Sequence, residues 1–449
     1  MYRRELLGAS DKVSYISSVV DDAEIFREVL ITMMEHVNEL ERARVINPDI
    51  ASTLRKALRE ILAEGYEPSK LTNFEDVHEY VESRLMEKVG PAGGWVGIGR
   101  SRNDHVTTAI RLRLRRYVLN LAQEALNLRE TLLNKAAQSN SQLIIGSTHR
   151  QPAQVTTLGH YMLYLDDLTR DFLNLLMSTY SMVNKSPLGS GPLAGTMVNL
   201  DRAREAQELG FDGIVTNTIY ATGSRFFIIT TASLIVDYLV EVGRFINNLE
   251  MWLMPQLNYV KADPKHLATS SIMPHKRNPA TLEVFRARVG EAVGHLMAMY
   301  SILRPVEAGY QLDLQELTRH LWAVMRIALE GLTMLRDFIN SLDVNDHRVI
   351  EDLGKYVITA AEYAEVTSMR EGRPFREVYN EVARAIREGA RVGLEPQSVV
   401  LKPVRGSSNP RDVVTEVSLR INEVRELRGR VDEELGRIDD AENRVLSGG

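Results

Sequence analysis

The sequence contains no cysteine among its 449 residues. This absence excludes disulfide bonds, zinc–thiolate and iron–sulfur centres, and cysteine nucleophiles. The 10 histidines are scattered, with no His-Glu-x-x-His pair, so we expect neither a metal site nor a cofactor. Positive charge is not in excess either, because the formal net charge is -6. We therefore expect no nucleic-acid partner, which would need a basic face.

Long apolar runs are also missing. No run of about 18 uncharged apolar residues occurs, so the sequence predicts no membrane span. The first residues, MYRRELLGASDKVSY, lack the apolar centre of a secretory signal. We therefore expect a cytoplasmic protein that is not associated with membranes.

Helical periodicity dominates what is present. One apolar stripe of about eight turns has members at steps of three and four: Val106, Ile110, Leu114, Val118, Leu121, Ala125, Leu128 and Leu132. A second stripe consists of Leu158, Met162, Leu165, Leu168, Phe172 and Leu175. Strand-like alternation is scarce. We therefore predict an all-α fold whose long helices form a bundle, and such bundles often continue across subunit boundaries.

Breaks in the periodicity suggest the domain organisation. Residues 90–100 are so rich in glycine that we expect no helix there, and residues 185–197 and 261–279 form two further long loops. Loops of this length in compact folds tend to be functional or disordered. The expected domains are a mixed helical N-terminal domain (1–99), a central long-helix bundle (100–348) and a C-terminal helical domain (349–449).

Two polar segments stand at expected helix starts. Ser101, Arg102 and Asn103 precede the first stripe, where they either cap the helix or bind an anion through free N–H groups and the Arg102 guanidinium. Thr148 and His149 are expected to open the second long helix. A histidine there is either structural or an acid–base group, because its ordinary pKa lies near neutrality.

The third segment, SSIMPHKRNP at 270–279, holds two hydroxyls, two cations, an imidazole and an amide. It is either a solvated loop or an anion site, and Asn278-Pro279 is expected to start a helix. This segment closely resembles the signature loop of the fumarase/aspartase superfamily. Taken alone, MPHKRNP is closer to the adenylosuccinate lyases of that superfamily.

Other segments resemble the argininosuccinate lyase family, to which the δ-crystallins are related. They are GRSRND (99–104), PLGSGPLAGT (187–196), FDGIVTNTIYATGSRFF (211–227), YQLDLQE (310–316) and GRPFREVY (372–379). The resemblance extends from about residue 15 to about residue 400 in matching order. It implies a three-domain fumarase/aspartase-like fold in which the central helices form the core of a homotetramer, with active sites shared between subunits. It also implies cofactor-free anti β-elimination of argininosuccinate to L-arginine and fumarate.

The resemblance assigns residue roles. Ser270 corresponds to the catalytic base, with Ser271 as the alternative. His149 corresponds to the general acid or to a group that orients the leaving guanidinium, and Glu283 to its carboxylate partner. Lys276 and Asn278 would stabilise the charge that develops on the substrate. The implied substrate contacts are Ser101, Arg102, Asn103 and Thr148 at the succinyl carboxylates, Arg225, Tyr310 and Gln315 elsewhere, and Ser18 and Asp22 at the arginine end.

The chain departs from the family at several positions. Thr269 replaces a glycine before the two serines, and Gly97-Ile98 replaces a His-Thr pair. Asp104-His105 replaces Asp-Gln, and Thr318 replaces a lysine. These changes weaken the expectation for the arginine end more than for the elimination. The alternatives are adenylosuccinate lyase, another lyase of the superfamily, and a non-enzymatic δ-crystallin-like protein.

Overall fold

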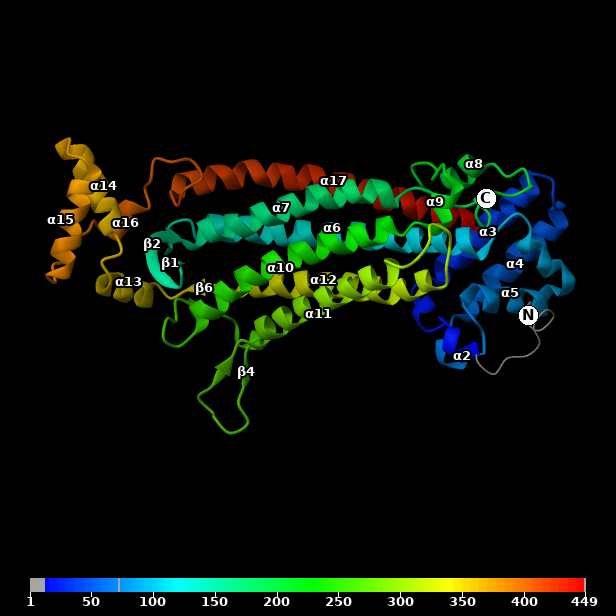
Figure 1. The fold of residues 1–449 in the computed structure, drawn as a ribbon, viewed down its shortest axis with the longest axis horizontal. Helices are drawn as coiled ribbons and strands as arrows, with labels where there is room; N and C mark the ends of the chain where they lie inside the picture. The colour runs from blue at the N-terminus through cyan, green and yellow to red at the C-terminus, as the bar shows by residue number, and fades with distance from the viewer. Residues whose placement is uncertain (1–12, 72, 448–449) are drawn as a thin grey trace.

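The computed structural model describes residues 13–71 and 73–447. It is mostly helical, and its longest helices run lengthwise beside one another (Figure 1). The all-α class expected from the sequence is therefore confirmed. The first twelve residues, which carry most of the argument against a secretory signal, lie outside the described residues.

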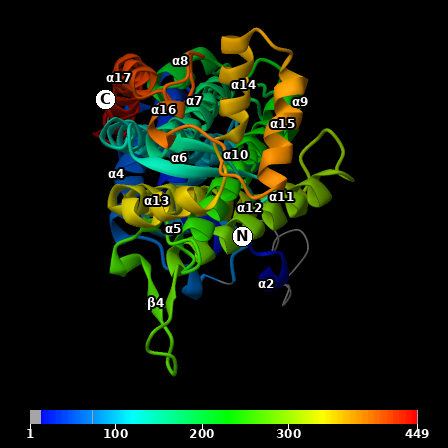
Figure 2. The ribbon, with the colours of Figure 1, turned by 90° about the vertical axis from the view of Figure 1, so that its left-hand side faces the viewer.

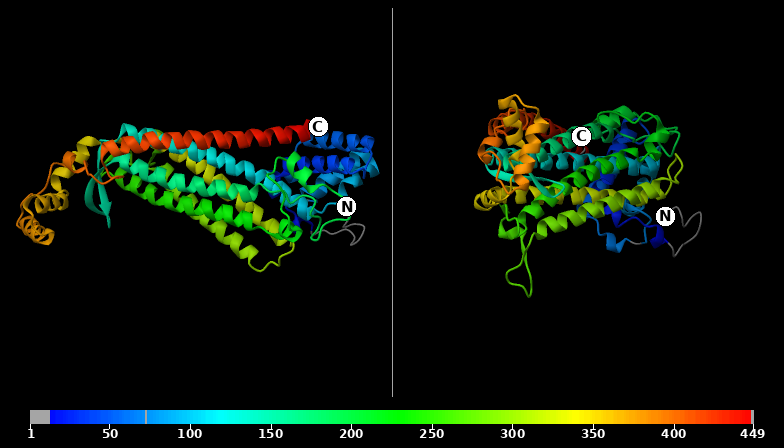
Figure 3. Two further views of the ribbon diagram at one scale, coloured as in Figure 1. Left: turned by 90° about the horizontal axis from the view of Figure 1, so that it is seen from above. Right: turned by 60° about the vertical axis from the view of Figure 1, so that its left-hand side comes forward.

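Among the described residues, five long helices that contact one another form the central bundle, and they run lengthwise in Figures 1 and 3. They are α6 (Arg102–Gln138), α7 (Leu158–Val183), α10 (Phe226–Leu253), α11 (Ala280–Leu303) and α12 (Asp313–Ser341). The apolar stripe predicted for the first helix is buried, since Ile110, Leu114 and Val118 are at most 1% exposed. Burial of such stripes against neighbouring helices supplies most of the stability of long helices.

The N-terminal helices pack beside the start of α6 at one end of the bundle (Figure 1). The elements there are α2 (Val13–Ile16), η1 (Asp21–Glu24), α3 (Phe26–Arg42), α4 (Pro48–Glu64), η2 (Pro68–Lys70), α5 (Val77–Val89) and η3 (Gly90–Gly97). The expectation that residues 90–100 contain no helix was wrong, because η3 is a 3-10 helix. Glycine is used there for close packing: a Cβ at Gly93 would lie 3.0 Å from the backbone of Met86.

The C-terminal helices begin at the opposite end of the bundle, and the last one returns along α6 and α7 (Figures 1 and 2). They are α13 (Asp346–Lys355), α14 (Ala360–Glu371), α15 (Phe375–Arg387), α16 (Pro396–Val399) and α17 (Pro410–Ser447). The short elements α8 (Arg202–Glu208), α9 (Thr218–Gly223) and η4 (Pro264–His266) lie in the connections. The division of the chain at residues 99 and 348 remains a prediction.

Three small antiparallel sheets interrupt the helices. Their strand pairs are β1 (Leu143–Thr148) with β2 (Gln151–Thr157), β3 (Val260–Lys261) with β6 (Asp343–Val344), and β4 (Ala268–Thr269) with β5 (Arg277–Asn278). The expectation that Thr148 and His149 open the second long helix was wrong, because they lie at the β1–β2 turn. Helix α7 begins at Leu158, and the Thr157 side chain caps it by accepting a 3.1 Å hydrogen bond from the amide of His160.

Helix α10 is long and apolar enough to qualify as a membrane span. The sequence analysis predicted no such span. The most apolar window of α10 is 56% buried inside the protein, where it packs against α7, α11 and α12. A core helix of a bundle has the same composition, because it is apolar on more than one face.

Candidate active site

Ser101 caps the start of α6, which is the first of the two interpretations given for this segment in the sequence analysis. The Ser101 hydroxyl accepts from the amide of Asn103 at 3.3 Å, and Asp104 accepts from the amide of Ser101 at 2.9 Å. This capping box fixes the turn that carries Arg102. The Arg102 guanidinium forms ion pairs with Asp76 at 3.1 Å and Glu75 at 3.6 Å. Arg102 is therefore held by two carboxylates. A substrate carboxylate would have to compete with them for the Arg102 guanidinium.

The glycine-rich loop at 185–197 packs against this turn. The side-chain amide of Asn103 donates to the carbonyl of Pro192 at 2.9 Å, and the second oxygen of Asp104 accepts from the amide of Gly191 at 2.9 Å. Gly191 has a φ of +64°, and a Cβ there would lie 2.5 Å from the carbonyl oxygen of Gly195. Burial raises the pKa of Asp104 to about 6, against the two amide hydrogen bonds that favour its charged form.

A cavity of about 140 Å³ brings together many of the predicted substrate contacts at this end of the bundle. We call it the acidic cavity; it is lined by Asp22, Glu75, Asp76, His78, Arg102, Asn103, Val106, Tyr310, Leu312 and Gln315. Ser18 adjoins it, because its hydroxyl donates to Asp22 at 2.6 Å and accepts from the side-chain amide of Gln315. Ser18, Asp22, Asn103, Tyr310 and Gln315 are thus neighbours despite their distance in sequence.

The acidic cavity holds carboxyl groups that sequence reasoning missed. Glu75 and Asp76 line it beside Asp22, and Asp76 also caps α5 by accepting from the amide of Glu79 at 2.7 Å. The capping pattern was the only signal in the sequence, and it does not distinguish a structural cap from a site residue. Burial raises the pKa of Asp22 to about 7, opposed by the hydrogen bond from Ser18.

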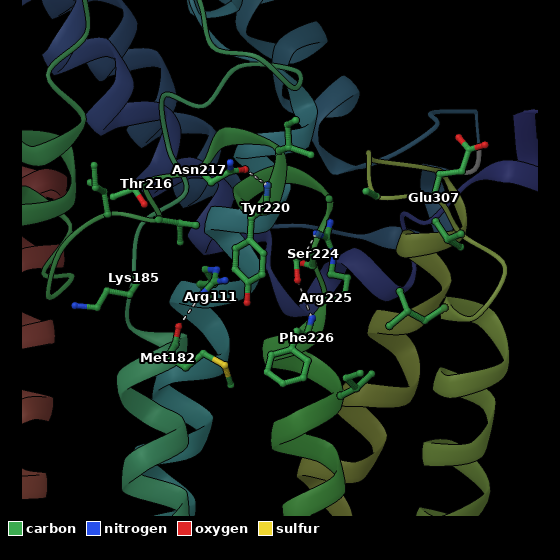
Figure 4. A pocket seen from close by; sticks show the side chains of 18 of the residues that line it. Arg111, Met182, Lys185, Thr216, Asn217, Tyr220, Ser224, Arg225, Phe226 and Glu307 are labelled. Carbon is green, nitrogen blue, oxygen red and sulfur yellow. Dashed lines mark hydrogen bonds between the residues drawn. The ribbon is translucent and has the colours of Figure 1, made fainter.

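Arg225 lies beside this cavity rather than in its lining. Its side chain is buried, and it donates to the carbonyls of Thr222 at 2.9 Å and Ser224 at 3.2 Å. The guanidinium carbon is 5.7 Å from the ring centroid of Tyr310. Arg225 instead lines a second cavity of about 1040 Å³, which we call the two-arginine cavity because Arg111 also lines it (Figure 4).

The β1–β2 turn carries Thr148 and His149 at the opposite end of the bundle (Figure 1). Both side chains are exposed. His149 and Arg150 have φ values of +53° and +61°, which place two non-glycine residues in the left-handed region. Such consecutive positive φ values are typical of the tightest hairpin turns and cost conformational energy in residues with a side chain. The turn presents His149 at its tip.

The signature loop 270–279 forms the tip of the β4–β5 hairpin, which projects from the side of the bundle (Figures 1 and 2). The Ser270 hydroxyl accepts from the amides of Met273 at 3.1 Å and Ile272 at 3.4 Å. Ser271 and Lys276 are exposed, and Asn278 lies in β5. Glu283 is exposed in the first turn of α11, which begins at Ala280, directly after Pro279.

Within one chain the acidic cavity lies far from the β1–β2 turn and from the β4–β5 hairpin. Helix α6 separates Arg102 from the β1–β2 turn, and its 37 residues span roughly 55 Å at 1.5 Å per residue. Helix α11 separates the β4–β5 hairpin from the connection that leads to Tyr310, and its 24 residues span roughly 36 Å. A single chain therefore does not bring His149, Ser270 and Arg102 into one site.

Comparison with known proteins decides the family. A family profile described as "Lyase" matches residues 10–294. An argininosuccinate lyase of Pyrobaculum calidifontis is 43% identical over 422 residues, covering 94% of this chain and 97% of the relative. An argininosuccinate lyase of Pyrococcus furiosus is 38% identical, covering 92% of this chain and 93% of the relative.

The chain belongs to the argininosuccinate lyase family. Solved structures with the same fold extend beyond that family. An EDDS lyase in complex with formate superposes with a TM-score of 0.85 at 23% identity, covering 97% of this chain and 94% of that structure. A class II fumarase from Schistosoma mansoni superposes with a TM-score of 0.73 at 16% identity, covering 87% and 91%. The fumarase-lyase fold expected from the signature loop is thus confirmed.

Proposed function

We propose that the chain is a carbon–nitrogen lyase that cleaves argininosuccinate to L-arginine and fumarate by anti β-elimination. The observation that carries this proposal is the match to argininosuccinate lyases over more than nine-tenths of both chains. Most of the predicted functional residues line or adjoin the acidic cavity or lie at the β1–β2 turn and on the β4–β5 hairpin, which supports the proposal.

Ser270 is the proposed base that removes the proton next to the succinyl carboxylate. A serine is a weak base unless its alkoxide form is stabilised. The amides of Ile272 and Met273 donate to the Ser270 oxygen and would favour that form, and Lys276 adds a positive charge to the same loop. Ser271 is exposed and, within the described part of the chain, accepts no such pair of amide hydrogen bonds, which supports Ser270 over Ser271.

Lys276 and Asn278 are the proposed stabilisers of the intermediate. Proton removal leaves a second negative charge spread over the carboxylate, and donors aimed at that charge lower the barrier by roughly 3–4 kcal/mol each. His149 is the proposed general acid or the group that orients the departing guanidinium. Glu283 is its proposed carboxylate partner, which would stabilise the imidazolium.

The carboxylate side of the acidic cavity is the proposed site for the arginine end of the substrate, while Arg102 and Asn103 in its wall remain the proposed contacts of the succinyl carboxylates. Asp22, Glu75 and Asp76 supply carboxylates, and Tyr310 and Gln315 supply a hydroxyl and an amide. The carboxylates suit the cationic groups of an arginine moiety. The lysine missing at Thr318 is not replaced by its neighbour, because Arg319 pairs with Asp21 at 3.2 Å and with Glu316 at 2.6 Å.

A homotetramer is the proposed functional form, in the cytoplasm. The acidic cavity and the two hairpins lie at opposite ends of helices that are roughly 36–55 Å long, so antiparallel copies would bring the cavity of one copy beside the hairpins of others. Exposed apolar side chains on the outer faces of α10 and α11 support assembly through the bundle. They are Val240, Val284, Val293, Met297 and Tyr300.

Mixing of inactive variants tests the shared site. His149→Asn and Ser270→Ala should each abolish fumarate release from argininosuccinate, which is followed by ultraviolet absorbance. When the two variants are unfolded and refolded together, some sites should draw the intact histidine from one copy and the intact serine from another, so that part of the activity returns. No recovery despite confirmed mixed tetramers would contradict the shared site. Parallel assays with adenylosuccinate separate the two lyase activities.

A further inference from the structure

The two-arginine cavity lies where α7 ends, α10 begins and the α11–α12 connection passes (Figure 4). Its polar lining includes Arg111, Lys185, Tyr220, Arg225 and Glu307. In this view Tyr220 lies between the two arginines, while Glu307 lies on the far side from Arg111. The two-arginine cavity, of about 1040 Å³, is far larger than the acidic cavity. None of the acidic residues that line the acidic cavity lines the two-arginine cavity.

The four most deeply buried arginines of the described chain divide into two kinds. Arg115 pairs with Glu442 and Arg129 pairs with Asp166, so these two buried charges are compensated. Arg111 and Arg225 are equally buried, yet within residues 13–71 and 73–447 neither forms an ion pair with a carboxylate. Buried charges in proteins are normally paired, because leaving water costs several kcal/mol per ion.

Main-chain carbonyls satisfy only part of the two guanidinium groups. Arg111 donates to the carbonyls of Met182 at 2.8 Å and Val183 at 3.1 Å, at the C-terminal end of α7, and its guanidinium carbon lies 3.9 Å from the ring centroid of Phe227. The Nε atoms of Arg111 and Arg225 are buried without a hydrogen-bond partner. Burial, together with the charge of Arg225, lowers the pKa of Arg111 to about 9.

Two further features add positive potential at this place. Helix α10, which has 28 residues, starts at Phe226 in the cavity wall, and the N-terminal end of a helix carries partial positive charge. Lys185 also lines the cavity. Two apolar lining residues, Ile219 and Phe226, are exposed by 42% and 54% and mark the edge of the cavity. The cavity therefore offers cations inside and apolar groups at its edge.

We propose that the two-arginine cavity binds a small organic oxyanion, a carboxylate or a phosphate ester, whose charged group is held by Arg111 and Arg225. This site is separate from the acidic cavity, which suits a cation. The arginine fork is the side chain best adapted to two-point binding of carboxylate and phosphate oxygens. The bound anion supplies the counter-charge that the single chain lacks. Because the resemblance also implies Arg225 as a substrate contact, the test below changes Arg111 and not Arg225.

Thermal melting of the assembled protein tests this site without any turnover. The probes are inorganic phosphate and succinate, each compared with sodium chloride at equal ionic strength. Because a ligand that binds the folded state raises its stability, we expect at least one probe to raise the Tm of the wild type by about 3 °C at saturation. A response to phosphate alone assigns the phosphate class, and a response to succinate alone assigns the carboxylate class.

Variants locate the response. Arg111→Gln should lose the rise in Tm, and Arg111→Lys, which keeps the charge without the fork, should retain part of it. Arg170→Gln is the matched control, because Arg170 pairs with Asp167 on the surface. Arg102→Gln changes a proposed succinyl contact in the acidic cavity, so it should remove only the part of a succinate response that comes from the active site. An unchanged response in Arg111→Gln, or no response of the wild type to either probe, overturns the proposal. The latter would point to a partner copy's carboxylate instead.

Discussion

Asp22 should make substrate binding depend on pH around neutrality. Its carboxyl is buried in the acidic cavity, and burial raises its pKa to about 7. The proposed ligand of this cavity is the cationic arginine end of the substrate, which requires the ionised carboxylate. With a pKa of about 7, roughly one-eleventh of Asp22 is ionised at pH 6 and ten-elevenths at pH 8. We therefore expect KM for argininosuccinate to fall about tenfold between these two pH values.

Three variants separate this effect from other titrations. Asp22→Asn should have a high KM that no longer changes with pH. Ser18→Ala removes a hydrogen bond that lowers the pKa of Asp22, so its profile should move to higher pH. Asp21→Asn removes a neighbouring negative charge that raises the pKa of Asp22, so its profile should move to lower pH. A wild-type KM that is flat from pH 6 to 8, or an Asp22→Asn variant that keeps the pH dependence, would refute the reasoning.

The same raised pKa affects the free protein in the opposite sense. The pKa of Asp22 in the folded protein is raised to about 7 from 3.8. The neutral carboxyl therefore contributes its full stabilisation of the fold below the unfolded-state pKa, and this stabilisation is lost as pH rises through 7. The wild type without substrate should therefore lose Tm relative to Asp22→Asn as pH rises from 6 to 8. Substrate should offset that loss, since a bound cation favours the charged form.

Two further predictions concern catalysis and stability. Ser270→Ala should lower kcat by a factor of about 10²–10⁴, the usual contribution of a positioned base, whereas Ser271→Ala should leave kcat within about twofold. Equal losses in both variants would remove the preference for Ser270. Glu442→Gln should destabilise the protein by about 3–5 kcal/mol, because it leaves the buried Arg115 without its carboxylate. Asp439→Asn on the same helix should cost at most about 1 kcal/mol, because the Asp439 side chain is 56% exposed where it pairs with Arg116. Similar shifts in Tm for these two variants would contradict the role given to burial.

The long helices could be predicted from the sequence because their signal repeats over many turns. The stripe from Val106 to Leu132 is confirmed within α6, and the cap at Ser101 is where the sequence placed it. The β1–β2 hairpin was missed because its buried residues, Leu143, Ile144 and Ile145, form a run too short to distinguish a strand from a helix. The left-handed φ at His149 has no sequence signal, since glycine or asparagine usually marks such turns.

The site residues were predicted by resemblance of short segments, and the structure adds what resemblance does not contain. The acidic cavity joins Ser18 to Gln315, a contact between residues 297 positions apart. Glu75 and Asp76 escaped notice because a helix cap and a site residue look alike in sequence. The counter-charge missing at Arg111 was equally invisible, since the sequence does not say which arginines are buried or with what they pair.

The position of each site group on its helix explains why assembly should be needed for catalysis. Caps, hairpin tips and loops are the places where a chain of long helices can present free N–H groups and side chains, and they occur at helix ends. In this chain they are separated by the lengths of α6 and α11, roughly 55 Å and 36 Å. No hinge motion within one bundle closes such a gap, because the helices between the groups are packed along their length. Antiparallel copies would close it without any motion, since the start of α6 in one copy would lie beside the β1–β2 turn of another. It follows that substitutions on the exposed face of α11, such as Val293→Glu, should abolish activity and tetramer formation together while leaving the fold of each chain intact.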